Sequence, residues 1–383
     1  MFKLLLVILL TFSLNADEYD FDMSVVEPDP YEYSGYLRID EKLQKLNNQN
    51  EAYQKYAHLE ALFDFYYYYE MLTFKSSLMA NYDYIADIGN FNHVEEKLSQ
   101  SDTSINELYI EAKLNTNHTL LVGKESLKWG KGYYFNPAAF FDRPKDPAQP
   151  TQTCEGFTLA KYSYNKSFTG DLKNLNFDFV YMPSNEYLNE DFNNLNTNIE
   201  DANNVAMRLY LLYFDTDIDF IYNYSDVRQN KIGVDFSNNL QVNFEVHGEF
   251  AKVLNEEYSY LLGGRYLTDF ELTIISEYLY NSDGLDKEEI KTASNALAFI
   301  AKDYWVTSFT QKEPLDWIYF SVYYKNTTNL QDLSQQNKFG GSYSFKNNMD
   351  VDLSYNKNSG KNLSEFGKKQ VSNFTWLQIT WKY

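Results

Sequence analysis

The sequence predicts an all-β protein, a transmembrane antiparallel β-barrel of about 18 strands, with roughly 16–18 as the expected range. Hydrophobic side chains recur at every second residue over most of the chain, and the predicted connections tend to alternate between long and short. The chain has 35 Tyr and 28 Phe among 383 residues, yet its formal net charge is −21. Aromatic residues favour strands, and this composition suits a barrel that meets lipid outside and water inside.

Residues 1–16 have the features of a secretory signal peptide. Lys3 precedes the apolar run Leu4–Leu14, and the small residue Ala16 stands before an acidic segment. A spanning helix needs about 20 apolar residues, so this run is too short for one. We expect cleavage after residue 16, export to the bacterial outer membrane, and one barrel domain over residues 17–383. An uncleaved membrane anchor is the alternative.

Charge and cysteine content exclude several classes of protein. The acidic net charge makes nucleic acid an unexpected partner, because its phosphates would repel the chain. Cys154 is the only cysteine, so neither an intrachain disulfide nor a thiol metal cluster is expected, and it does not lie at the cleavage site, as a lipoprotein anchor would require. None of the four histidines has zinc-ligand spacing. We expect no cofactor and no metal.

Alternation of side-chain type defines the strands. In Leu240–Phe250 one face carries apolar residues and glycine, while the other carries Gln, Asn, His and Glu. The segment Ile218–Tyr224 alternates less cleanly, because Ile221 falls on the polar face. A soluble β-sandwich would also alternate, so this pattern alone does not decide the class. The expected strands are 31–40, 57–70, 73–88, 104–114, 118–129, 156–166, 174–183, 203–214, 217–226, 230–236, 240–253, 256–268, 271–281, 302–311, 315–327, 337–346, 349–357 and 374–383.

Connection lengths give a second line of evidence. Outer-membrane barrels have short periplasmic turns and longer outer loops. With both termini periplasmic, every long connection falls on the outer side, although outer connections 227–229 and 254–255 are short. An open sheet in hydrocarbon would leave unpaired edge groups, so Tyr31–Leu37 is expected to pair with the last strand. The long connections are 41–56, 89–103, 130–155, 184–202, 282–301, 328–336 and 358–373.

The final strand, Asn373–Tyr383, carries the first resemblance. Its two faces are Thr375, Leu377, Ile379, Trp381 and Tyr383, and Trp376, Gln378, Thr380 and Lys382. Apolar residues at alternating positions before a terminal aromatic residue resemble the last strand of Gram-negative outer-membrane barrels. The resemblance implies two partners: outer-membrane lipid, and the barrel-assembly machinery, which recognises this strand.

The most distinctive connection is 130–155. It follows a Gly-Lys-x-x-x-Lys-Trp-Gly stretch that is similar to a strand-end pattern in porin-like proteins of uncertain substrate. Asn136 followed by Pro137 predicts a helix start, and three further prolines stiffen the loop. A long, rigid outer loop resembles the constriction loop of general porins; the alternative is a surface loop that seals the barrel top. The candidate constriction residues are Trp129, Lys131, Asn136, Pro137, Arg143, Lys145 and Asp146.

Carboxylates on the polar faces of the strands suggest an acidic lumen that favours cations. Polar-face bases such as Lys113 and Arg208 are fewer. The alternative is that acidic residues merely solvate a wide pore. The candidate lumen charges are Glu107, Glu111, Asp217, Asp219, Glu245, Glu249, Glu271 and Glu277.

Three functions remain open. The first is a porin-like channel for passive diffusion of small solutes or ions. The second is the barrel component of an export or envelope-assembly complex, with residues 17–26 and the helical-looking segment 41–56 as docking elements. The third is an outer-membrane enzyme, which needs Ser, His and an orienting residue on adjacent strands. No such set is visible, and His247 between Glu245 and Glu249 fits a solvated polar face, so we expect no enzymatic activity.

Overall fold

The computed structural model describes residues 29–47, 53–90, 93–143, 145–150, 152, 154–192, 201–294 and 298–383. The expected signal peptide and residues 17–26 lie outside these ranges. The strands are β1 (Tyr31–Leu46), β2 (Tyr53–Tyr69), β3 (Leu72–Asn90), β4 (His93–Lys113), β5 (His118–Glu125), β6 (Phe157–Ser167), β7 (Leu172–Ser184), β8 (Ala202–Tyr213), β9 (Thr216–Ser225), β10 (Lys231–Gln241), β11 (Phe244–Val253), β12 (Tyr258–Leu267), β13 (Leu272–Asn281), β14 (Asp303–Lys312), β15 (Phe320–Asn329), β16 (Gln335–Phe345), β17 (Met349–Ser359) and β18 (Val371–Lys382). The described helical elements are η1 (Glu190–Phe192), α2 (Lys287–Thr292) and η2 (Pro314–Asp316).

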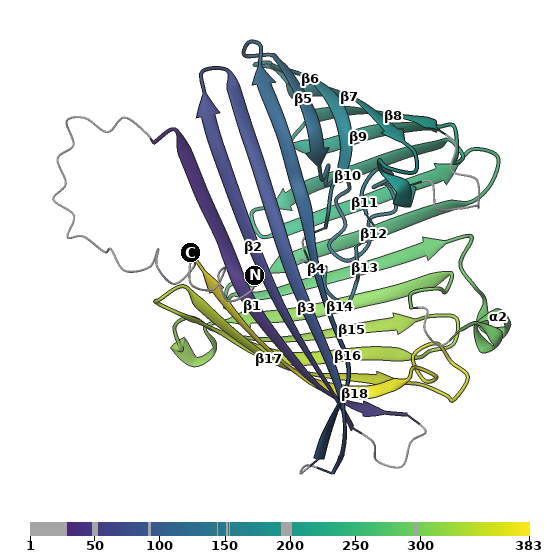
Figure 1. The fold of residues 1–383 in the computed structure, drawn as a ribbon. Helices are drawn as coiled ribbons and strands as arrows, with labels where there is room; N and C mark the ends of the chain where they lie inside the picture. The colour runs from purple at the N-terminus through teal and green to yellow at the C-terminus, as the bar shows by residue number, and fades with distance from the viewer. Residues whose placement is uncertain are drawn as a thin grey trace.

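The 18 strands form one closed antiparallel barrel (Figure 1). Each strand pairs with its neighbour in sequence, and β18 pairs with β1 in a register that places Gln378 opposite Asp40. The Tyr383 N–H donates to the Gly35 carbonyl oxygen at 3.1 Å. Closure pairs the first strand with the last, so neither leaves a free edge in a bilayer. The part of β4 before Leu108 extends beyond the end of β5 and pairs in the ladder with β3 alone. The predicted fold class and the predicted pairing of first and last strands are confirmed.

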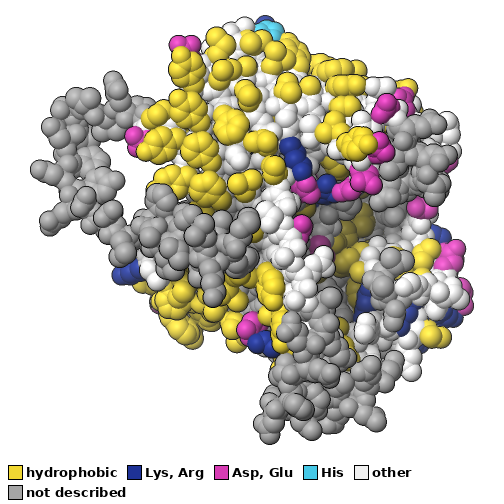
Figure 2. Space-filling view, in the orientation of Figure 1, with side chains coloured by type: hydrophobic (Ala, Val, Ile, Leu, Met, Phe, Trp, Pro, Cys, Tyr) yellow, Lys and Arg dark blue, Asp and Glu magenta, His cyan; other side chains and the backbone are white. Residues whose placement is uncertain are grey.

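The barrel wall is apolar outside and polar inside. Ile39 and Leu353 on the outer face are 43% and 54% exposed, whereas their inward-facing neighbours Asp40 and Ser354 are 4% and 2% exposed. Figure 2 shows hydrophobic side chains spread over the outside of the long N-terminal strands. This inverts the pattern of a soluble protein and suits a lipid-facing wall. No helix among the described residues is long and apolar enough to cross a membrane.

The two rims of the barrel differ in the length of their connections. One rim has short turns, including 70–71, 214–215 and 242–243. The opposite rim carries the long connections, including 126–156 and 282–302. The start of β1 and the end of β18 both lie at the short-turn rim, since Gly35 bonds to Tyr383 there (Figure 1). This is the arrangement that the connection lengths predict.

The prediction of a helical-looking connection over 41–56 is wrong. β1 continues to Leu46, β2 begins at Tyr53, and Glu41 pairs with Ala57 in the ladder between them. β4 likewise begins at His93, inside the predicted connection 89–103. In β1 this end carries polar residues on both faces, so the alternation of apolar and polar residues disappears while backbone pairing continues.

Two smaller corrections concern turns. Glu271 is not on the barrel wall: it is exposed, has a φ of 66°, and ends the turn between β12 and β13. The segment 240–253 is not one strand, because a two-residue turn at 242–243 separates β10 from β11. Hydrophobic alternation continues in phase across that turn, so periodicity did not reveal it. The remaining strand boundaries differ from expectation by a few residues.

Candidate functional site: a loop bound inside the barrel

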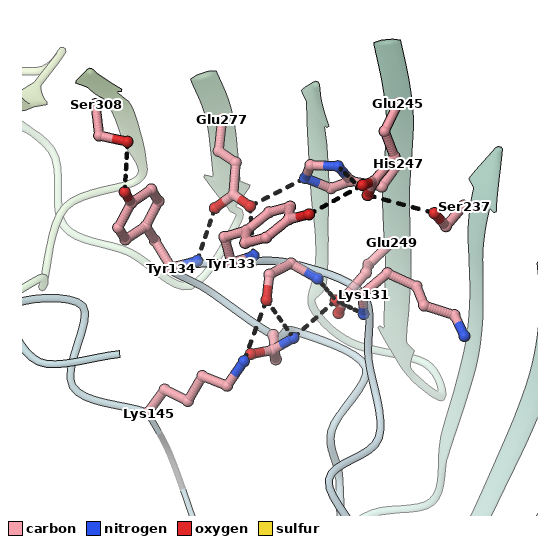
Figure 3. Close-up of polar contacts among 12 residues, drawn as sticks. Lys131, Tyr133, Tyr134, Lys145, Ser237, Glu245, His247, Glu249, Glu277 and Ser308 are labelled. Atoms are coloured by element: carbon pink, nitrogen blue, oxygen red, sulfur yellow. Dashed lines mark hydrogen bonds and ion pairs between the residues drawn. The ribbon is translucent and has the colours of Figure 1, made fainter. Parts of the chain in front are cut away.

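The connection 126–156 between β5 and β6 binds to the inner face of the barrel. Its described residues contact inward-facing side chains of β11, β13 and β14 (Figure 3). They also contact Lys325 of β15. The Tyr134 hydroxyl, for example, donates to the Ser308 hydroxyl at 2.7 Å. The loop therefore folds into the barrel, which is the first of the two predicted placements, and does not lie as a surface loop over the barrel top.

Glu249 on β11 accepts four hydrogen bonds from the loop. Its Oε1 accepts from the backbone N–H groups of Lys131 and Gly132 at 2.6 and 2.7 Å, and from Asn136 Nδ2 at 3.0 Å. Its Oε2 accepts the Ala138 N–H at 3.0 Å. Glu249 is 3% exposed, so these donors replace water around a buried carboxylate. Hydrogen bonds to charged groups each contribute about 1.5–3 kcal/mol.

Glu277 on β13 binds the next two loop residues. Its carboxylate accepts the backbone N–H groups of Tyr133 and Tyr134, the latter at 3.0 Å. His247 Nε2 lies 3.0 Å from the same carboxylate, and the Tyr133 ring packs edge-on against the imidazole at 5.2 Å. The Tyr133 hydroxyl donates to Glu245 at 2.9 Å. His247 is thus fully enclosed between the wall and the loop, not solvated as the sequence suggested.

Lys131 is the cationic contact between the loop and the wall. Its Nζ lies 3.0 Å from Asp219 and 4.0 Å from Asp235, two buried carboxylates that are opposite each other on β9 and β10. The predicted site residue Lys131 and the predicted lumen charge Asp219 therefore neutralise each other. Asp235 was not predicted, although it follows the same alternation.

A lysine on the wall holds the far end of the loop. Lys325 of β15 donates to the carbonyl oxygens of Pro147 and Ala148 at 2.7 and 3.3 Å. Within the loop, Lys145 Nζ donates to the Gly132 carbonyl oxygen at 3.1 Å. Asp146 accepts the Ala148 N–H at 2.8 Å and has no direct bond to the wall in the described residues. The loop therefore presents N–H groups to wall carboxylates and carbonyl groups to a wall lysine.

The predicted helix start at Asn136 is wrong. Pro137 and Ala138 form a turn without a following helix. Asn136 instead donates from its amide to Glu249 and to the Gly132 carbonyl oxygen. Tertiary contacts with the wall thus replace the local capping that the sequence suggested.

Asp142 orders the beginning of the loop. Its carboxylate accepts the backbone N–H groups of Lys128 and Trp129, both at 2.8 Å. Burial raises the pKa of Asp142, while these N–H groups act in the opposite direction. Arg143 pairs with Glu155 and with Asp191, which ties the loop to the next long connection.

Apolar residues on the inner face support the loop. Trp129 is 4% exposed, and the Arg208 guanidinium lies 5.4 Å from its ring centroid. A second cluster joins Tyr134 and Phe135 to the wall and to two other long connections. Loop and wall thus share cores inside the barrel. The buried residues of the first cluster are Leu121, Trp129, Ala138, Phe140, Phe141, Phe157, Leu159, Val180, Met182, Phe192, Ala206, Ile221 and Ala251.

The other predicted lumen carboxylates have varied positions. Glu107 pairs with Lys75 and accepts the Ser126 N–H where the loop begins. Asp217 accepts the hydroxyl of Tyr210. Glu111 lies on the inner face opposite Leu121. With Glu271 excluded, seven of the eight predicted residues line the inner wall, and most of them are bound to other groups.

Sequence reasoning missed a group of inward-facing cations on the opposite wall. Lys42 of β1 and Lys338 of β16 lie 4.2 and 4.6 Å from the ring centroid of Trp376 on β18. Arg38 pairs with Asp40 at 3.3 Å and Glu60 at 2.7 Å. Alternation places each of these residues inside, but it does not show that they come together, because β16 and β1 are distant in sequence.

Comparison with known proteins supports the fold. No family model and no curated protein matches the sequence. The structure is similar to that of OccK7 (OpdD) from Pseudomonas aeruginosa, with 10% identity, a TM-score of 0.56, and coverage of 93% of this chain and 99% of that one. It also matches structures of Rhodopseudomonas blastica porin, including a multiple mutant with 10% identity, a TM-score of 0.47 and coverage of 92% of this chain. The chain therefore has the same overall fold as OccK7.

Proposed function

We propose that this protein is an outer-membrane channel for passive diffusion of small solutes, in which the loop 126–156 narrows the lumen. The observation that carries the proposal is the loop itself, bound inside a closed barrel by wall carboxylates and Lys325. Such a channel works by diffusion through water, limited by pore width and charge. Trp129, Asn136 and Pro137 then position the loop, and Lys131, Arg143, Lys145 and Asp146 supply its charges.

Location and partners follow from the wall. An apolar outer face supports contact with outer-membrane lipid, and short turns at the rim of both described ends support a periplasmic position for that rim. Cleavage of residues 1–16 and recognition of β18 by the assembly machinery belong to the proposal. The acidic charge argues against a nucleic-acid partner.

A cation preference remains a finer hypothesis within this proposal. Carboxylates still contribute to the potential of the lumen when they are hydrogen-bonded. However, Lys131 neutralises part of the acidic wall, and Lys42 and Lys338 oppose it from the other side. We therefore expect a weak preference rather than strict selectivity.

Planar-bilayer recordings of the purified protein test both the channel function and the cation preference. Stable open steps support the channel, and the reversal potential under a salt gradient reports the ion preference. Anion preference contradicts the cation hypothesis alone. Silence from a correctly folded barrel, identified by its band shift on unboiled gels, contradicts the channel and favours the barrel of a partner complex. For the enzyme alternative, hydrolase activity that is lost on His247→Ala is the decisive result.

A further inference from the structure

We infer that Glu249 and Glu277 together form a latch that holds residues 130–138 against the wall and so sets the width of the lumen. They are positioning residues: each acts on passing solute only through the loop. The effect of the latch on lumen width rests on the proposed function, whereas the contacts between the two carboxylates and the loop do not.

The chemistry of the contacts supports a latch. Five of the six loop donors to these two carboxylates are backbone N–H groups, and the sixth is the amide of Asn136. Backbone groups point in fixed directions, so a carboxylate that accepts several of them fixes the course of the chain. Both acids are nearly fully buried, at 3% and 1% exposure, and water cannot easily replace the lost bonds.

Replacing either Glu by Gln keeps the size of the side chain but replaces one acceptor oxygen by an NH₂ donor. Donors approach both oxygens of Glu249, with Lys131 and Gly132 on Oε1 and Ala138 on Oε2. A glutamine must therefore turn its own NH₂ group toward an N–H donor. The same holds at Glu277, where Tyr133 and Tyr134 approach different oxygens. We expect Glu249→Gln/Glu277→Gln to release the segment from the wall.

A reversible tether separates release of the loop from the loss of two charges. A Cβ atom added to Gly233 of β10 would lie 3.4 Å from the Cβ of Ala138, close to the usual separation in a disulfide. The Phe140 ring, 3.1 Å from the same position, must shift slightly. Ala138→Cys/Gly233→Cys, in a Cys154→Ser background, therefore allows the loop to be locked by oxidation and freed by reduction.

Two readouts are combined in the experiment. Trypsin cleavage after Lys131, mapped by mass, reports whether the loop leaves the wall, and single-channel conductance reports the lumen. For the latch variant we expect increased cleavage and a conductance about twofold higher or more, with both reversed by the oxidised tether and restored by reduction. If the untethered variant fails to fold, it can be folded with the tether closed and then reduced. Asp352→Asn removes an inward carboxylate on β17 and should leave cleavage unchanged.

The outcomes separate the latch from the channel. Wild-type cleavage and wild-type conductance in the latch variant overturn the inference. So does a conductance increase that persists with the tether closed, because charge and not release then explains it. If the wild-type barrel is silent while the latch variant shows tether-sensitive cleavage, the latch stands and the proposed function fails.

Discussion

The two halves of the inner wall are built differently. From β5 to β14 the inner face combines buried carboxylates such as Glu249 and Glu277 with apolar residues that the loop covers. These apolar residues include Leu121, Val180, Ala206, Ile221 and Leu261. From β15 through β18 to β4 it carries mainly ions, amides and aromatic rings, including Arg38, Asp40, Lys42, Glu60, Lys325 and Lys338. In the described residues, apolar side chains on the inner wall are thus concentrated where the loop binds, alongside the carboxylates that hold it.

The largest expected effect is on the loop-bearing half. Trp129→Ala removes a buried ring from the cluster between loop and wall and should lower the free energy of unfolding by about 3–5 kcal/mol. Urea unfolding followed by circular dichroism measures it. Trp317→Ala, at an exposed position on the short-turn rim, is the matched control and should change little. Equal losses of unfolding free energy at the two positions would show that the cluster between loop and wall contributes no more stability than the exposed rim.

The ionic half should respond to the loss of a single partner. Arg38→Met leaves Glu60, which is 2% exposed, without its cation and should lower the free energy of unfolding by about 2 kcal/mol. Adding Glu60→Gln should recover part of this loss, because the buried charge is then gone. Failure of the second substitution to compensate would show that Arg38 stabilises the wall through Asp40 or through packing, and not through Glu60.

The boundary between the halves lies at β15, where Lys325 touches the loop. Lys325→Met keeps the length of the side chain but leaves the Pro147 and Ala148 carbonyl groups without their donor, at a cost of about 1.5 kcal/mol. Trypsin sensitivity near Lys145 should rise with it. Lys312→Met, at an exposed position on β14, is the control, and an equal effect there would contradict a specific contact.

The smallest effect is expected at the rim of the ionic half. Lys382 and Asp350 form an ion pair at 2.6 Å, but their side chains are 61% and 32% exposed. Lys382→Ala should therefore change the free energy of unfolding by no more than about 1 kcal/mol, and less at high salt. Urea titrations at two salt concentrations measure it. A large, salt-independent loss would mean that the ionic half is stabilised at its rim as well as inside.

One feature of the sequence pointed to the loop-bearing half. Ile221 interrupts the alternation of β9, and in the structure it faces inward and packs in the cluster beneath the loop. The inward position of Leu261 on β12 is of the same kind. An apolar residue at an inward position of a barrel strand therefore indicates a covered part of the wall, because an apolar side chain gains nothing from contact with a water-filled lumen.

The sequence by itself determined the number of strands to within two, the face presented by most residues on them and the closure of the sheet, because a lipid-facing wall imposes a period of two on every spanning strand. It did not determine the extension of β1, β2 and β4 past the predicted ends, where β1 carries polar residues on both faces. Only the tertiary structure decided where the loop lies. Its main polar anchors to the wall are backbone N–H and carbonyl groups, which nearly every residue possesses, so no pattern of side chains in residues 130–150 records them. In the sequence, the carboxylates of Glu249 and Glu277 look the same as those that water solvates.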